Sequence, residues 1–320
     1  MKKNKKWISF KDQLDVLKSR GLVVDNEPAA LDYLERIGYY RLSGYWHSFR
    51  ALKLGLDDAV EASERRQDAF QQGSHFKHAV DLYVFDKKLR LLALDALERI
   101  ELAVRVDIAY LLGKQDAYAH ENPDMFHGNF TKIKRNGEQP AHQDWLEKYH
   151  SHVHRARREP FVKHYLDKYG KLPIWVAIEI WDFGLLSKIF AGLKHEHKEI
   201  IASKYGAKNG KAFASWLRGL NFIRNVSAHH SRLWNINVLE RSAEIEDDAF
   251  WKQLNNARPY FYFYFCLMKR LLDVICPNSH WSSRFCTLLD EFPVIESGAV
   301  SLVDFALIER PWEWTLWQKI

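Results

Sequence analysis

The stretch from Phe76 to Leu112 reads FKHAVDLYVFDKKLRLLALDALERIELAVRVDIAYLL, and its apolar residues recur at intervals of three and four. That spacing places them along one side of an α-helix, which turns once in about 3.6 residues. The stretch therefore predicts one long helix, or two helices joined near Asp86. Similar spacing predicts helices in five further segments: Phe10 to Arg20, Ala30 to Ile37, Ile174 to Leu193, Lys211 to Ile223 and Ala257 to Ile275.

Signals for β-strands are weak in this chain. No convincing pair of alternating segments is present, and the turn-forming pair Asn136-Gly137 lies in a polar segment. We therefore predict an all-α fold with a helical core over residues 76–235, an N-terminal helical region over 1–75 and a C-terminal helical extension over 236–320. The segment from Gly113 to Asp144 is rich in Asn, Pro, Gly, His and Lys, so we expect a long surface segment that orders only with a partner.

The composition is that of an ordinary globular protein. A chain of 320 residues with 47% hydrophobic content can bury a core without a disulfide or a metal. The spacing of Cys266, Cys276 and Cys286 fits neither a disulfide framework nor a zinc site, and no apolar run has the length of a secretion signal or a membrane span. We expect a soluble cytoplasmic protein, and the net charge of +6 favours polyanionic partners.

The segment from Arg224 to Asn235, RNVSAHHSRLWN, is the strongest candidate for a chemical site. An arginine can hold a phosphate through its rigid fork of donors, and a histidine can move a proton near neutral pH. Together these residue types suit the cleavage of RNA without a metal ion. From spacing alone, a structural alternative is as good: the same residues would close a helix end, with Arg224 pairing with a buried glutamate and Trp234 completing the core.

Helical geometry separates the two histidines of this segment. On an ideal helix His229 shares a face with Asn225 and Arg232, whereas His230 shares a face with apolar residues. His229 is therefore predicted to be the reactive histidine and His230 the packed one. Arg224 lies about 140° from His229 around such a helix, so their convergence requires a helix end, a kink or a second subunit.

Four blocks of sequence carry a family resemblance. The spacing of Arg224, Asn225 and His229 resembles the R-x(4 to 6)-H signature of the HEPN ribonucleases. The chain also resembles the Abi-like (AbiD/AbiF) abortive-infection proteins of bacteria, over roughly residues 10–235. The blocks are IGYYRLSGYW (37–46), LYVFDKKLRLLALDALERIELAVR (82–105), KYGKLPIWVAIEI (168–180) and AHHSRLWN (228–235).

The resemblance implies a fold, an activity and partners. The fold would be a HEPN-like helical bundle that forms a homodimer and so brings two copies of the motif together. The activity would be a metal-independent endoribonuclease of an anti-phage abortive-infection system, restrained until infection. Neither a cofactor nor a metal is implied. A small regulatory RNA, an antitoxin and a phage trigger are the partners that this class of protein would have besides its RNA substrate.

The predicted chemistry gives each motif residue a role. In RNA cleavage the 2′-hydroxyl attacks the adjacent phosphate, and negative charge builds on the phosphoryl oxygens. His229 would act as general base or acid, and His230 would assist as a second acid. Arg224 would stabilise the developing charge, while Asn225 would orient the histidine or bind the phosphate. The alternative function is a non-catalytic RNA-binding module that grips phosphate with the same groups.

Residues outside the motif are candidates for binding RNA or for orienting the site. Glu98 and Arg105 of the long helix could reach the Arg224/His229 site, although a solvated charged face is the simpler interpretation. The aromatic run with a turn at Ser43-Gly44 could stack on bases or pack in the core. The histidines of HSHVHRARR (150–158) lack a carboxylate at metal-site spacing, so a basic face is favoured there. The predicted RNA-binding residues are Arg232, Arg155, Arg157, Arg158, Arg41, Tyr45 and Trp46.

Overall fold

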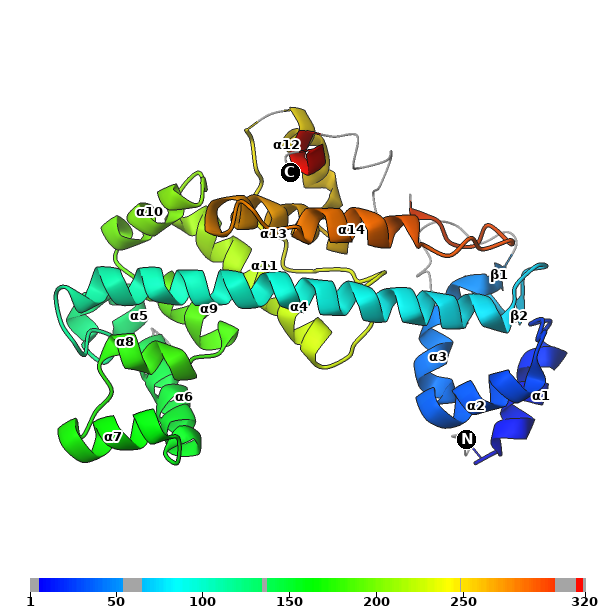
Figure 1. Cartoon of the computed structure of the whole chain (residues 1–320), viewed down its shortest axis with the longest axis horizontal. Coiled ribbons are helices and arrows are strands. Elements are labelled where there is room, and N and C mark those ends of the chain that lie inside the picture. Colours follow the sequence, from blue (N-terminus) through cyan, green and yellow to red (C-terminus); the bar gives the residue numbers. More distant parts are fainter. Residues whose placement is uncertain (1–5, 54–64, 134–136, 248, 303–314, 319–320) are drawn as a thin grey trace.

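The computed structural model describes residues 6–53, 65–133, 137–247, 249–302 and 315–318, and helices dominate it (Figure 1). The all-α prediction is confirmed. The α-helices are α1 (Phe10–Ser19), α2 (Glu27–Ile37), α3 (Tyr39–Trp46), α4 (Phe76–Gly113), α5 (Gly128–Thr131), α6 (Ala141–Ala156), α7 (Pro160–Tyr169), α8 (Ile174–Ala177), α9 (Phe183–Gly192), α10 (His195–Lys204), α11 (Gly210–Ala228), α12 (Ala249–Leu254), α13 (Phe261–Ile275), α14 (Trp281–Asp290) and α15 (Thr315–Gln318). The short 3-10 helices and strands are η1 (His47–Phe49), η2 (Pro123–Met125), η3 (Ile178–Ile180), η4 (Asn255–Ala257), β1 (Arg50–Leu52) and β2 (Arg66–Phe70).

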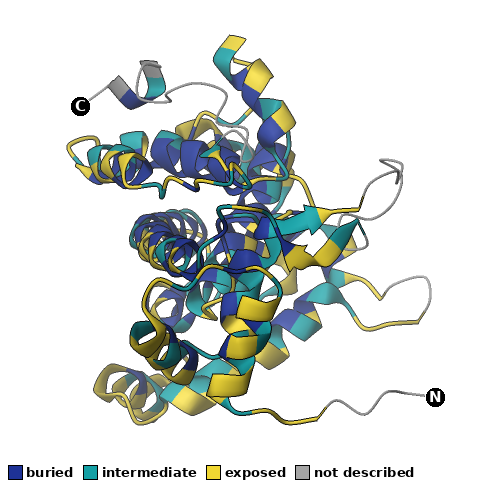
Figure 2. Ribbon diagram, turned by 90° about the vertical axis from the view of Figure 1, so that its right-hand side faces the viewer, coloured by how far each residue is buried: buried dark blue, intermediate teal, exposed yellow. Residues whose placement is uncertain are grey.

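Helix α4 forms the axis of the molecule. It is one continuous helix of 38 residues, without the junction near Asp86 that the sequence left open. Helices α13 and α14 lie along one side of it, α11 crosses it and packs against α9, and α3 packs near its N-terminal end (Figure 1). In an end view the buried residues gather around this axis, and the outer helices carry the exposed residues (Figure 2).

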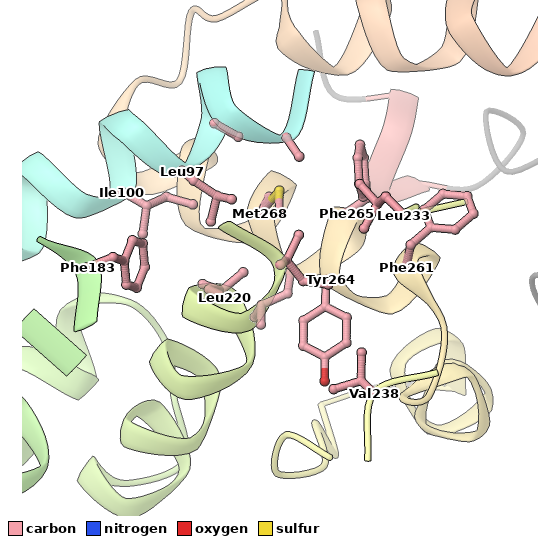
Figure 3. Packing of buried hydrophobic residues seen from close by; sticks show 14 of the residues in the cluster. Leu97, Ile100, Phe183, Leu220, Leu233, Val238, Phe261, Tyr264, Phe265 and Met268 are labelled. Atoms are coloured by element: carbon pink, nitrogen blue, oxygen red, sulfur yellow. The ribbon is translucent and has the colours of Figure 1, made fainter. Parts of the chain in front are cut away.

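The core is built where α11 and α13 pack against the middle of α4. Leu97 and Ile100 of α4, Leu220 of α11, and Phe265 and Met268 of α13 are all buried and converge there (Figure 3). Buried apolar side chains form a continuous cluster from the N-terminal helices to α15. Burial of this much apolar surface is the main stabilising contribution to such a fold. None of the described helices is long and apolar enough to cross a membrane.

A small antiparallel sheet lies beside α3 and was not predicted. Strands β1 and β2 pair with Arg50 opposite Phe70, and the guanidinium of Arg66 donates to the carbonyls of Ser48 (2.7 Å) and Arg50 (2.8 Å). Most residues of β2 are exposed, so this strand lacks the alternation of apolar residues by which a half-buried strand is recognised. The expectation that the chain has no strand pair is therefore corrected.

The helix predicted over Ile174 to Leu193 is interrupted. The chain forms α8, then η3, and then α9, which begins after Asp182. The side chain of Asp182 accepts a hydrogen bond from the backbone N–H of Leu185 at 2.7 Å, which caps α9. After this break, α9 packs against α11.

The segment after α4 is packed and does not form the predicted surface excursion. In its described parts, Ala119, Met125, Phe126 and Phe130 are buried. His120 is fully buried, and its ring lies edge-on to Tyr149 with 4.9 Å between centroids. Neither ring nitrogen of His120 has a hydrogen-bond partner among the described residues. The polar composition misled the prediction, because a few large apolar residues, Met125, Phe126 and Phe130 among them, are enough to anchor the segment in the core.

Burial of His120 makes stability depend on pH. Burial lowers the pKa of His120 to about 3, from an ordinary value of 6.5. The folded state therefore excludes a proton that the unfolded chain binds, so stability present above pH 6.5 is lost as the pH falls from 6.5 towards 3. The loss is up to roughly 5 kcal/mol, at about 1.4 kcal/mol per pKa unit.

We expect His120→Phe to reduce the slope of unfolding free energy against pH in this window, measured by urea unfolding followed by circular dichroism. The exposed His164 on α7 offers a matched control, and His164→Phe should leave the slope unchanged. The same slope in both variants would contradict the assignment to His120.

Candidate functional site

The motif formed by Arg224, Asn225 and His229 lies at the C-terminal end of α11. Arg224 and Asn225 belong to its last turn, and the helix ends at Ala228. His229 continues the helical bonding, since its backbone N–H donates to the carbonyl of Asn225 at 3.0 Å. His230 then adopts a left-handed conformation with a φ of 57°, which turns the chain away from the helix axis. The prediction that the helix faces continue beyond His229 is therefore wrong.

A buried carboxylate on α4 holds the chain that follows this turn. Asp86 is fully buried, and its Oδ1 accepts hydrogen bonds from the backbone N–H groups of Leu233 (3.0 Å) and Trp234 (2.7 Å). Its Oδ2 accepts a hydrogen bond from the hydroxyl of Tyr45 (2.7 Å) and forms an ion pair with Arg90. One side chain thus joins α4, α3 and the segment after the motif.

The donors around Asp86 favour its charged form, whereas burial disfavours it. Burial raises the pKa of Asp86, and the Arg90 guanidinium and the three hydrogen-bond donors act against that rise. Arg90 also donates to the carbonyl of Ser231 at 3.3 Å. Satisfied buried networks of this kind rigidify the groups around them.

Two arginines tie α3 to the motif segment in opposite directions. The guanidinium of Arg41 on α3 donates to the carbonyl of His230 at 2.7 Å, and Arg232 donates to the carbonyl of Gly44 on α3. A Cβ at Gly44 would lie 2.7 Å from Nη1 of Arg232, so glycine leaves the room for this contact. The residues Ser43 and Gly44 lie within α3, which corrects the turn predicted there.

These contacts enclose a basic hollow of about 500 Å³ between α3, η1 and the motif segment. Both His229 and His230 are exposed in it, so the prediction that His230 is packed is wrong. No carboxylate belongs to the described lining. The lining residues are Tyr40, Arg41, Ser43, Gly44, Tyr45, His47, His229, His230, Ser231 and Arg232.

His47 is a member of this hollow that the sequence reasoning missed. Partial burial lowers its pKa, and the charges of Arg50, Arg66 and Arg232 lower it further. His47 is therefore neutral near pH 7 and can accept a proton. The available signal was its position, directly after the aromatic run that ends at Trp46.

Arg224 faces a different hollow from His229. This second hollow, of about 350 Å³, is lined by a stripe of α4 that contains Glu98 and Arg105. Both residues therefore share a hollow with Arg224 but not with His229. Burial raises the pKa of Glu101 there, and Arg105 and then Arg224 oppose that rise. Within one chain, Arg224 and His229 therefore do not converge on one described hollow.

The remaining predicted RNA contacts divide into accessible and inaccessible residues. Tyr45 and Trp46 are buried, so the prediction that bases stack on them is wrong: both rings are core, and the exposed aromatic of this run is Tyr40. Three arginines near the end of α6 are exposed but do not line the His229 hollow. They are Arg155, Arg157 and Arg158.

Two histidines of the same segment form hydrogen bonds within the protein. The ring of His152 donates through Nδ1 to the carbonyl of Ile180 at 2.9 Å, and Nε2 of His154 accepts from Arg157 at 2.8 Å. Across the described residues, no group of three or more His, Cys, Asp or Glu side chains is placed to hold a metal ion.

Fold and site together define an all-α protein with a basic, histidine-lined hollow at the end of a central helix. The sequence profile of the family described as Abi-like protein matches residues 32–235, which is more than half of the chain. The chain belongs to the Abi-like protein family, and the predicted resemblance to that family is confirmed. Comparisons with curated proteins and with solved structures gave no match.

We expect Asp86→Asn to lower the free energy of unfolding by about 3–5 kcal/mol, because it leaves Arg90 buried without its partner charge. Urea unfolding measures this loss. The control is Asp81→Asn on the same helix, which breaks only a partly exposed pair with Lys77 and should change stability little. Equal effects of the two substitutions would contradict the role of Asp86.

Proposed function

We propose that this Abi-like protein is a metal-independent endoribonuclease of a bacterial defence against phage. The observation that carries the proposal is one hollow lined by the exposed His229 and His230, by His47 and by two arginines, Arg41 and Arg232. Groups that exchange protons near neutral pH therefore adjoin groups that attract phosphate. Membership of the Abi-like family suggests the defence role.

The proposed reaction is a transesterification that conserves the number of phosphate bonds. A neutral histidine removes the proton of the 2′-hydroxyl, the 2′-oxygen forms a bond to phosphorus, and the bond from phosphorus to the 5′-oxygen breaks. A second, protonated histidine gives a proton to the leaving 5′-oxygen. The products are a 2′,3′-cyclic phosphate and a 5′-hydroxyl. His229 supplies one of the two roles, and His47 or His230 supplies the other.

The arginines of the hollow can bind a phosphate while they also stabilise the fold. Arg41 and Arg232 each use Nη1 to bind a backbone carbonyl. A guanidinium has five N–H donors, so each side chain keeps others for a phosphoryl oxygen, and the carbonyl contact orients them. The exposed ring of Tyr40 adds a surface on which an unpaired base can stack.

We propose further that Arg224 acts on RNA bound to a second copy of the chain. Arg224 faces its own hollow on α4, away from His229, as described above. Leu102 lines that hollow, and with Val106 and Tyr110 it forms an apolar stripe at four-residue spacing that is 44%, 55% and 68% exposed, respectively. A homodimer that covers this stripe would bring the Arg224 of one copy towards its partner.

We expect wild-type protein to cleave end-labelled single-stranded RNA in EDTA and leave 2′,3′-cyclic phosphate ends. His229→Ala should slow cleavage by about 10²- to 10⁴-fold, the usual contribution of a general acid or base, while RNA affinity stays close to that of wild type. Product ends are mapped on a sequencing gel, and affinity is measured by fluorescence anisotropy.

The control for this experiment is His164→Ala, which removes an exposed histidine on α7 far along the chain from the motif. Cleavage at equal rates by the wild type and by both variants would assign the activity to another site or a contaminant. RNA binding without cleavage by the wild type would favour the second candidate function, a non-catalytic RNA-binding module. The separation of Arg224 from His229 within one chain is the observation that favours this second function.

A mixing experiment tests the proposed homodimer. We expect Arg224→Ala and His229→Ala proteins each to cleave RNA far more slowly than wild type and their mixture, refolded or co-expressed, to regain activity. A site that takes arginine from one copy and histidine from the other leaves one intact site in each mixed dimer. A site formed within one chain leaves none, so failure of the mixture to regain activity would rule out the shared site.

A further inference from the structure

A third hollow, of about 530 Å³, lies between α9, α11 and the chain that follows the motif, and the reaction proposed above does not use it. Its walls combine cations, amides and apolar groups. The lining residues are Gly184, Ser187, Lys188, Arg218, Gly219, Asn221, Phe222, Asn225, Asn237, Val238, Leu239 and Glu240.

One wall of this hollow is a stripe along α11. Arg218, Asn221, Phe222 and Asn225 follow one another at intervals that return to the same face of a helix. Arg218 is exposed, and Phe222, an aromatic residue on this outer face of α11, is 41% exposed. The stripe is therefore free to contact a ligand.

The two cations of the hollow are not ion-paired. Neither Lys188 nor Arg218 forms an ion pair in the described part of the chain. The side chain of Lys148 on α6 lies beside Lys188 and lowers its pKa, while Asp144 and Asp182 raise it more weakly. Neighbouring like charges that are held together favour a bound anion, because an anion offsets their repulsion.

The amides and the ring suit a nucleobase. The side chains of Asn221 and Asn237 make no hydrogen bond with other described residues, so their donors and acceptors remain available. An amide presents a donor and an acceptor side by side, which matches the edge of a base. Phe222 offers an aromatic face, and Leu239, which is 84% exposed, offers an apolar one. The carboxylate of Glu240 is the one acidic group in the lining and can accept from a base amino group.

We propose that this hollow binds a nucleotide, with the phosphate at Lys188 and Arg218 and the base against Phe222, Asn221 and Asn237. The nucleotide is either part of an RNA strand or a free nucleoside monophosphate, and the two share this chemistry. Its assignment to an RNA strand rests on the proposed function, whereas the site itself does not.

The position of Asn225 connects this hollow to the motif. Asn225 lines the hollow, and its Oδ1 accepts a hydrogen bond from Arg224 at 3.3 Å. Eleven residues separate Arg218 from His229, which is about 16 Å along a helix. A strand bound in the hollow would therefore lie within a short run of nucleotides of the proposed cleavage site, so the hollow would select which bond is cut.

The test measures binding without cleavage. A short fluorescein-labelled single-stranded RNA is titrated with full-length protein in the His229→Ala background, at several salt concentrations and without divalent ions. We expect Phe222→Ala to weaken binding about tenfold, as loss of one stacked base does. Arg218→Ala and Lys188→Ala should each weaken it and lower the slope of log affinity against log salt by about 0.7, the value for one lost phosphate contact in a single strand.

The matched control is Lys11→Ala, which removes one exposed positive charge from α1. All four substitutions are at the surface, and thermal unfolding checks that each variant is folded. Changes in affinity and salt slope no larger than those of Lys11→Ala would overturn the proposal.

Competition by adenosine, guanosine, cytidine and uridine monophosphates separates the two sources. Displacement of the labelled RNA by a monophosphate, lost in Arg218→Ala, supports a site for a free nucleotide, and binding of RNA alone supports a strand. This experiment measures binding and not cleavage, so its result can be interpreted even if the protein is not a ribonuclease. Conversely, if the wild type cleaves RNA and Phe222→Ala does not weaken RNA binding, the nucleotide site is ruled out and the ribonuclease proposal stands.

Discussion

The buried carboxylate of Asp86 is the interaction on which the arrangement of the site depends. Its oxygens accept from two backbone N–H groups after the motif, from Tyr45 on α3 and from Arg90 on α4. An isolated buried charge is strongly unfavourable, so all of these donors must be in place together. The segment after His230 and helix α3 are consequently held in one position relative to α4. The basic hollow exists because those two elements meet.

The end of α11 distributes the polar residues of the motif over separate surfaces. The helix stops at Ala228, and the left-handed His230 turns the chain towards α3. Arg224 still faces α4, whereas His229 faces Arg41 and His47. Residues that are neighbours in sequence therefore take part in different sites. This division is the reason for proposing a second copy of the chain for the reaction and a separate nucleotide hollow along α11.

Sequence reasoning reached the helices that have a regular apolar period, α4 and α11 among them, and the position of the motif. The spacing of apolar residues in α4 and α11 reports burial directly, because a helix places every third or fourth residue on the same side. It failed where burial does not follow a simple period. The segment around His120 is polar in composition but packed, and Tyr45 and Trp46 belong to the core although they lie in a run that suggested stacking. His47 was missed because a single histidine forms no spacing pattern that would mark it as part of a site.

The amino-acid sequence by itself determined the helical class, the Abi-like resemblance and the residue types that can act on a phosphate, since these depend on local periodicity and on side-chain chemistry. Only the tertiary structure decided which of those residues share a surface. That outcome depends on where α11 ends, on the contacts of Asp86 and on the paired contacts of Arg41 and Arg232 with backbone carbonyls. Such contacts join residues more than a hundred positions apart, and no periodicity in the sequence records them.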